Sequence, residues 1–132
     1  MKHAVIVEAV RTPVGRAHKE KGWYRDVRSD DLATDVVKAI VERSGIDPQE
    51  VEDVILGNTQ QQLEQGLNVG RNVALMAGLP AATAGATVNR LCGSSLQALN
   101  QAAHSVMAGF EDVQIVGGLE HMHHVPMDLD ID

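Results

Sequence analysis

The 132-residue sequence predicts a single α/β domain with a mostly parallel sheet. Short runs rich in β-branched residues alternate along the chain with longer segments of helical period. The first run is continuously apolar, which is typical of a strand buried on both faces. One chain of this length is sufficient for one hydrophobic core. We therefore expect the order β-α-β-α-β-α-β, with right-handed crossovers between parallel strands.

The N-terminal third predicts one strand and one helix. The strand is expected over residues 3–10, and it should end at the proline- and glycine-containing turn 11–15. Ser29 is a candidate N-cap, two aspartates follow it, and Gly45 lies just beyond the expected C-terminus of the helix. The apolar positions of this helix fall on one face: Leu32, Val36, Val37, Ile40 and Val41.

The middle of the chain predicts two further strands and a short helix. A strand is expected within residues 51–57, followed by a glutamine-rich loop over residues 58–66. Residues 67–77 have helical period, and residues 84–88 predict a third strand of weaker composition.

A third helix is expected over residues 94–107, ending at Gly109. Ala98 and Ala102 make this helix narrow, so that neighbouring elements can approach it closely on more than one side. A fourth strand, residues 113–116, leads into a pair of glycines. The expected apolar stripe of the helix is Leu96, Leu99, Ala103, Val106 and Met107.

Composition excludes several classes of function. The net charge of −7 and the presence of only three aromatic residues argue against a nucleic-acid surface. The one basic stretch, residues 16–28, also contains two acids; we interpret it as a solvated loop, with a local contribution to phosphate binding as the alternative. No apolar run is long enough to span a bilayer, and the N-terminus does not have the pattern of a signal peptide. We expect a cytoplasmic protein.

The only cysteine, Cys92, falls between the third strand and the third helix, within Val-Asn-Arg-Leu-Cys-Gly-Ser-Ser. Ligands and reactive groups of open α/β sheets gather at such junctions. The unpaired N–H groups and the positive end of the helix dipole favour a thiolate there, and they can donate hydrogen bonds to an oxyanion. A single cysteine cannot form an internal disulfide. These arguments favour acyl transfer, although a lone cysteine is more often a small buried hydrophobe.

Four segments together resemble the thiolases, and among them the 3-ketoacyl-CoA thiolases of bacterial fatty-acid oxidation. They are Val5–Arg16, Leu56–Leu75, Thr87–Leu99 and Val116–Met127. The resemblance implies a thiolase-like N-terminal core domain over residues 1–127.

The resemblance also implies roles for single residues. Cys92 is the expected nucleophile, and its own backbone N–H is expected to help hold the thioester oxygen. Asn89 and Met122 lie in matched motifs and are expected to shape the pocket. Three other matched residues are expected to fix the backbone: Gly117, Gly118 and Glu120.

The reaction that the resemblance implies is cleavage of a 3-ketoacyl-CoA by Cys92, followed by transfer of the acyl chain to coenzyme A. Coenzyme A is then a substrate, and no permanently bound cofactor is expected. A full-length member is expected to be a homodimer or to join another subunit of fatty-acid oxidation. The family's Gly-His-Pro and Asn-Glu-Ala-Phe motifs and its second cysteine do not occur in these 132 residues. We therefore expect this stretch alone not to turn over substrate.

The C-terminal end departs from the family pattern. Residues 128–132 form an acidic tail that resembles the start of a calcium loop but lacks its glycine and distal glutamate. A truncation, a shifted reading frame and an engineered end all remain open as explanations.

The histidines allow a metal-site hypothesis, which we consider weaker than a structural one. His121, His123 and His124 are clustered, but adjacent histidines do not readily bind one ion, and no cysteine completes the set. We expect no metal site, and a structural role for His104. Two alternatives to an acyltransferase remain: a non-catalytic assembly module and, with less support, a sterol-carrier or synthase relative of the same fold.

Overall fold

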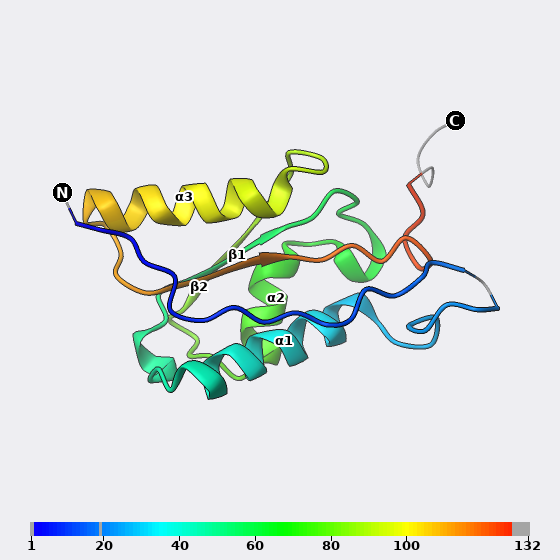
Figure 1. The fold of residues 1–132 in the computed structure, drawn as a ribbon, viewed down its shortest axis with the longest axis horizontal. Helices are drawn as coiled ribbons and strands as arrows, with labels where there is room; N and C mark the ends of the chain where they lie inside the picture. Colours follow the sequence, from blue (N-terminus) through cyan, green and yellow to red (C-terminus); the bar gives the residue numbers. More distant parts are fainter. Residues whose placement is uncertain (1, 19, 128–132) are drawn as a thin grey trace.

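A parallel sheet of three strands forms the centre of the computed structural model, which describes residues 2–18 and 20–127 (Figure 1). The strands are β1 (Asp53–Gly57), β2 (Ala84–Val88) and β3 (Gln114–Gly118). Their order is β2-β1-β3, and both pairs are parallel. The α/β class and the parallel sheet are confirmed. The acidic tail expected at residues 128–132 lies outside the described residues.

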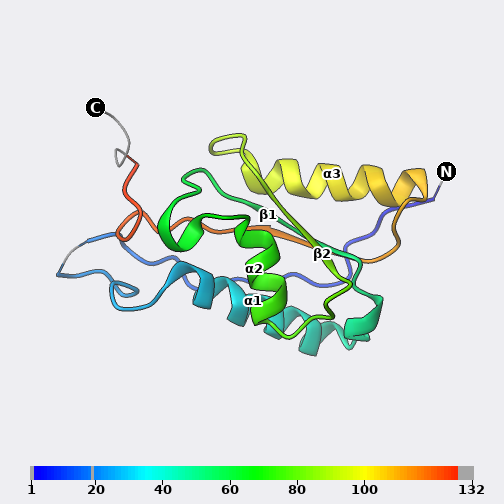
Figure 2. The same ribbon diagram turned by 180° about the vertical axis from the view of Figure 1, so that it is seen from behind.

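Helices cover both faces of the sheet (Figure 2). Helices α1 (Ser29–Ser44) and α2 (Val69–Met76) lie on one side, and α3 (Ser94–Ala108) lies on the other (Figure 1). Two 3₁₀ turns, η1 (Pro48–Glu50) and η2 (Leu63–Gln65), connect these elements. None of the helices in the described part of the chain has the length and apolar character needed to cross a membrane.

The predicted first strand is absent. Residues 3–10 form no strand, and the side chains of Val5, Ile6 and Val7 are 78%, 73% and 70% exposed. The continuous apolar run predicted burial on both faces, but a strand needs a neighbour that accepts and donates ladder hydrogen bonds. No described residue pairs in this way with the segment, which makes the ion pairs Lys2–Asp112 and Glu8–Arg43 with the rest of the domain. The described order is therefore α-β-α-β-α-β, with the three strands and three helices otherwise as expected.

The start of α1 also differs from expectation. Ser29 is the first residue of the helix, and Arg28 occupies the N-cap position without a side-chain cap. The carboxylate of Glu64, on η2, accepts hydrogen bonds from the backbone N–H of Ser29 at 2.7 Å and from its hydroxyl at 3.0 Å. The capping acceptor therefore comes from 35 residues away. The predicted end is confirmed, since Gly45 ends the helix with a φ of 69°.

Two hydrophobic clusters lie on opposite faces of the sheet. Alternate residues of β1 divide between them: Val54 and Leu56 face α1 and α2, and Ile55 faces α3. On α3 the buried apolar residues are Ala98 and Ala102, which pack against Ile55. These alanines, rather than the larger residues of the predicted stripe, make the contact; Leu96 and Met107 are exposed.

Two glycines allow α3 to approach the sheet closely. A Cβ atom on Gly57 would lie 2.4 Å from both the carbonyl carbon of Ser94 and the nitrogen of Ser95. A Cβ atom on Gly118 would overlap the side-chain oxygen of Ser95 on α3 and would lie 2.8 Å from the carbonyl oxygen of Gly57. The two glycines are register partners at the ends of β1 and β3. The first turn of α3 therefore rests on the backbone at the C-terminal edge of the sheet.

The other end of β1 carries a partly buried carboxyl group. Asp53 Oδ1 is buried without a hydrogen-bond partner among the described residues, and both amide atoms of its register partner Gln114 are in the same state. Burial raises the pKa of Asp53; a hydrogen bond from the N–H of Val54 acts against this rise, and the negative charge of Glu111 adds to it. The ionised form of Asp53 therefore destabilises the folded state.

We predict that Gly57→Ala lowers the free energy of unfolding by about 2–3 kcal/mol, because backbone atoms of α3 occupy the position of the new methyl group. Gly117→Ala is the matched control, since the nearest atom to its Cβ is Leu56 Cδ2 at 3.6 Å, an ordinary contact. Urea unfolding of both variants checks this. Equal losses of stability would show that close approach at Gly57 is not required.

We also predict that Asp53→Asn stabilises the protein at pH 7 by less than about 1 kcal/mol, because solvent screens a partly exposed charge. A carboxyl group whose pKa is raised by folding destabilises above that pKa and has no such effect once it is protonated in both states. The gain in stability from Asp53→Asn should therefore disappear as the pH falls below about 3.8, the ordinary pKa of this carboxyl group. Unfolding curves between pH 3 and pH 8 measure it, with Asp35→Asn on the exposed face of α1 as the control.

Candidate active site

Cys92 lies in the turn between β2 and α3, as the sequence predicts. It is a free, exposed cysteine, and α3 begins two residues later at Ser94, with Gly93 in the N-cap position. The strand before it ends at Val88, so that the turn extends beyond the C-terminal edge of the sheet. The sulfur atom is therefore accessible at the edge where parallel sheets usually bind ligands.

Hydrogen bonds within the turn fix its backbone. Gly93 donates to the carbonyl of Arg90 at 3.0 Å, and Ser94 donates to the carbonyl of Leu91 at 3.0 Å. The hydroxyl of Ser94 accepts a further hydrogen bond from the N–H of Arg90 at 2.9 Å. Leu91 has a φ of 49°, a left-handed conformation that a branched side chain rarely adopts. The residue immediately before Cys92 is therefore held in an uncommon conformation.

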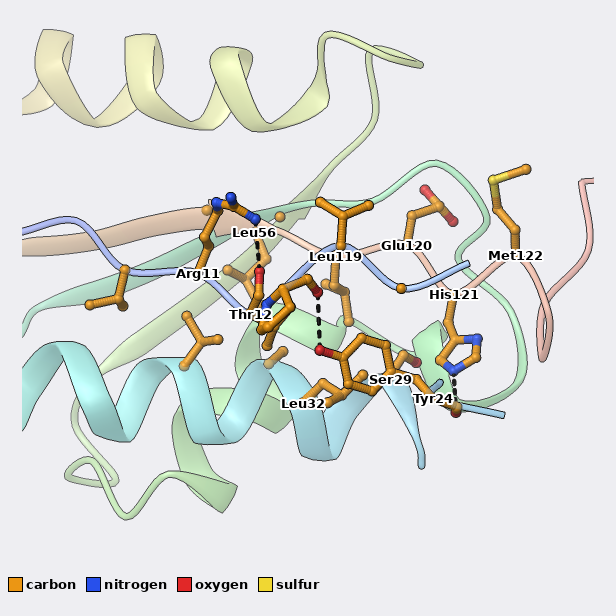
Figure 3. Close-up of a pocket in the computed structure, with 18 of the residues that line it drawn as sticks. Arg11, Thr12, Tyr24, Ser29, Leu32, Leu56, Leu119, Glu120, His121 and Met122 are labelled. Carbon is orange, nitrogen blue, oxygen red and sulfur yellow. Dashed lines mark hydrogen bonds between the residues drawn. The ribbon is translucent and has the colours of Figure 1, made fainter. Parts of the chain in front are cut away.

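A cavity of about 460 Å³ lies elsewhere, between α1, residues 10–17 and the segment that follows β3 (Figure 3). Met122, which was expected to shape the pocket around the nucleophile, lines this cavity. Cys92 and Asn89 do not line it. Within the described residues, the structure therefore does not bring the predicted nucleophile to this cavity.

Histidines beside this cavity connect three segments of the chain. The rings of His121 and His124 stack with their centroids 4.0 Å apart. His121 Nε2 lies 3.0 Å from the carbonyl oxygen of Tyr24, and His124 Nε2 lies 2.6 Å from that of Arg25. Since a carbonyl only accepts, both Nε2 atoms carry hydrogen. These nitrogen atoms are occupied by protein contacts, and no group of three potential metal ligands occurs among residues 2–18 and 20–127.

The second ring nitrogen of His124 contacts Glu64. The distance from Nδ1 to Glu64 Oε1 is 3.0 Å. The hydrogen bond to the Arg25 carbonyl raises the pKa of His124, burial acts against this, and the hydrogen bond and charge of Glu64 raise it further. Burial favours a higher pKa for Glu64, but hydrogen bonds from Ser29 and His124 outweigh it and lower the pKa. The pair is therefore stabilised as imidazolium and carboxylate.

Glu120 organises the loop that follows β1. Its carboxylate accepts hydrogen bonds from the N–H groups of Thr59 at 2.8 Å and Gln60 at 3.3 Å. It also accepts from the side-chain amides of Asn58 at 3.3 Å and Gln65 at 3.0 Å. These contacts agree with the backbone-fixing role expected for Glu120.

Sequence reasoning did not identify Glu64 or Tyr24 as parts of this network. Glu64 lies in a glutamine-rich loop and acts on residues 35 and 60 positions away, so that no local pattern signals it. Tyr24 contributes its carbonyl to His121, and its hydroxyl donates to the carbonyl of Pro13 at 3.0 Å. Its position within a basic stretch carries no signal for either contact.

The fold and the turn together define a class: an α/β domain that presents an exposed cysteine at the start of a helix. The chain belongs to the thiolase family, because residues 4–132 match the family model described as thiolase, N-terminal domain. This match confirms the resemblance of the four motif segments and the expected fold.

Curated relatives agree with this assignment. The chain is 49% identical to a 3-ketoacyl-CoA thiolase of Aliivibrio salmonicida and 50% identical to one of Shewanella loihica, over 100% of this chain and 34% of each relative. It is 52% identical to a 3-ketoacyl-CoA thiolase of Psychrobacter arcticus, over 99% of this chain and 33% of the relative. The chain spans about a third of the length of the curated relatives that it matches.

We predict that the Glu64–His124 pair stabilises the fold most strongly between about pH 4.5 and pH 6.5. The contribution of His124, whose pKa is raised, is complete below its ordinary value and is lost as the pH rises through the raised one. The contribution of Glu64, whose pKa is lowered, is complete above its ordinary value and is lost as the pH falls through the lowered one.

Thermal unfolding of Glu64→Gln and His124→Gln across pH 4–9 measures this effect, which we expect to be about 1 kcal/mol or less. His104→Gln, at an exposed position on α3, is the control. A loss of stability that is the same at every pH would contradict an ionic contribution.

Proposed function

We propose that this chain is part of a thiolase that transfers acyl groups between thioesters of coenzyme A, with Cys92 as its nucleophile. The observation that carries the proposal is the exposed Cys92 at the start of α3, in a chain about half identical along its whole length to relatives named 3-ketoacyl-CoA thiolase. Acyl transfer needs an accessible nucleophile and donors for the developing oxyanion.

The reaction begins when the sulfur of Cys92 attacks the 3-keto carbon of a 3-ketoacyl-CoA. The bond between carbons 2 and 3 breaks, and carbon 2 takes up a proton as acetyl-CoA leaves. The remaining acyl chain stays on Cys92 as a thioester. The thiol of a second coenzyme A then attacks this thioester, gives up its proton, and releases the shortened acyl-CoA together with free Cys92.

The turn provides part of this chemistry. The start of α3 lies two residues after the cysteine, where the unpaired N–H groups and the positive end of a helix dipole can stabilise a developing negative charge. No hydrogen bond among the described residues uses the N–H of Cys92, so this group remains able to donate to the thioester oxygen. The exposure of Cys92 leaves room for a long acyl-CoA to approach.

Acid–base catalysis must come from other groups. Each half-reaction moves a proton, and the sequence contains no second cysteine. The Nε2 atoms of His121 and His124 are engaged by backbone carbonyls, which argues against their use as bases. Because the curated relatives are about three times as long as this chain, we propose that their remaining sequence corresponds to the part that provides the acid and base. Residues 1–132 alone would then accept an acyl group without turning over.

Exposed apolar side chains support contacts with further protein. They lie on the N-terminal segment and on the outer face of α3: Val5, Ile6, Val7, Leu96 and Met107. We propose that the functional protein covers them, through the rest of a longer chain and through association of subunits. A reducing compartment such as the cytoplasm suits an exposed free cysteine.

We predict that incubation with a 3-ketoacyl-CoA or an acyl-CoA adds the mass of one acyl group to the chain. The added mass should be absent in Cys92→Ser, because the hydroxyl group is a far weaker nucleophile at this position. Intact-mass spectrometry measures the adduct, free coenzyme A is the ligand control, and added coenzyme A should remove it. An adduct that persists in Cys92→Ser would refute the assignment, and the absence of any adduct would favour a non-catalytic assembly module.

A further inference from the structure

We propose that Asn89 is a positioning residue for Cys92, and that it acts by tying the cysteine-bearing turn to the loop that Glu120 organises. The proposal rests on the proposed function, because it assigns Cys92 as the nucleophile. Asn89 is the first residue after β2, three positions before the cysteine. Its side chain connects two separate segments.

Each end of the Asn89 amide makes one hydrogen bond. Oδ1 accepts from the backbone N–H of Leu91 at 2.9 Å, and Nδ2 donates to the carbonyl of Thr59 at 3.0 Å. The first bond lies within the turn and the second crosses to a loop 30 residues earlier in the chain. Only an amide offers both an acceptor and a donor at this reach.

The first hydrogen bond acts on the uncommon backbone of Leu91. A left-handed conformation costs a residue with a side chain about 1–2 kcal/mol. The bond from Leu91 N–H to Asn89 Oδ1 offsets part of this cost, since asparagine accepts hydrogen bonds from the backbone two residues on. Because Leu91 precedes Cys92 directly, its φ of 49° sets the direction in which the chain presents the cysteine.

The second hydrogen bond has a fixed partner. Glu120 accepts from the N–H of Thr59, the residue whose carbonyl receives Asn89. The loop is further held because Asn58 N–H donates to the carbonyl of Val88 at 3.0 Å. The turn after β2 is therefore braced by segments that follow β1 and β3. This connection predicts that a substitution of Glu120 alters the position of Cys92 through its effect on Thr59 and Asn89.

Alkylation of Cys92 by iodoacetamide, followed by mass spectrometry, tests the role without any acyl-CoA. We expect Asn89→Ala to slow alkylation by about threefold or more, because the loosened turn no longer holds the exposed sulfur of Cys92 in one orientation. Asn72→Ala is the matched control, since it removes another bond from an asparagine amide to a carbonyl, that of Leu67, in an exposed part of α2. Its alkylation rate should be unchanged.

Two further variants separate positioning from general loss of stability. Asn89→Asp keeps the acceptor for Leu91 but loses the donor to Thr59, so that the Cα chemical shift of Leu91 should keep its left-handed value, which Asn89→Ala should lose. Glu120→Gln should slow alkylation in the native background and have little further effect in the Asn89→Ala background. This non-additivity is the expected sign of a shared pathway.

Thermal unfolding of each variant completes the test. Slower alkylation in variants that remain folded at the assay temperature, with non-additive effects of Asn89 and Glu120, supports the proposal. Unchanged alkylation in Asn89→Ala, or rates that are additive, would overturn it. Because alkylation needs no acyl-CoA, these results are independent of whether Cys92 accepts an acyl group, and failure of acylation alone refutes only the proposed function.

Discussion

The contact on which the rest of the structure depends is the one between the first turn of α3 and the C-terminal edge of the sheet. Gly57 lacks a side chain where it meets the backbone of α3, and Gly118 lacks one where it meets the side chain of Ser95, so that the helix begins directly over the ends of β1 and β3. A larger residue at Gly57 would displace the start of α3, because backbone atoms of Ser94 and Ser95 occupy the position of its side chain. The cysteine two residues before the helix would move with it, which makes the sheet edge and the turn that carries Cys92 one structural unit.

A polar network holds the loops around this unit. Glu64 caps α1 and contacts His124, while Glu120 gathers the donors of the loop after β1. Both carboxylates accept from backbone N–H groups of segments distant in the sequence, and such charge-assisted bonds are stronger than those between neutral groups. Irregular segments without strand pairing therefore acquire fixed positions relative to the sheet. The Asn89 amide extends the same network to the turn that carries Cys92.

The sequence predicted those features that depend on local patterns. The three strands, the three helices, the glycine ends at Gly45 and Gly109 and the junction at Cys92 follow from periodicity and turn chemistry. The prediction of a first strand was wrong because an apolar run indicates burial but not the presence of a neighbouring strand with which to pair. The prediction of Ser29 as the N-cap was wrong because Glu64, distant in sequence, supplies the acceptor for the backbone N–H at the start of the helix. Contacts between loops produce no periodic pattern in the sequence, and the sequence therefore did not predict them.

The small residues on the buried face of α3 determine how closely the helix packs on the sheet. Alanines at the contact bring the helix axis close to the sheet, and Leu96 and Met107 remain exposed on the outer face. With the start of α3 at the sheet edge, these two side chains therefore form an exposed apolar surface on the helix. Cys92 does not line the cavity beside the histidines, so that in the proposed function the acyl-CoA at the cysteine is held by groups other than this lining. The chain thus fixes the position of Cys92 through its own backbone, while the apolar residues on the outer face of α3 remain open to contact with other protein.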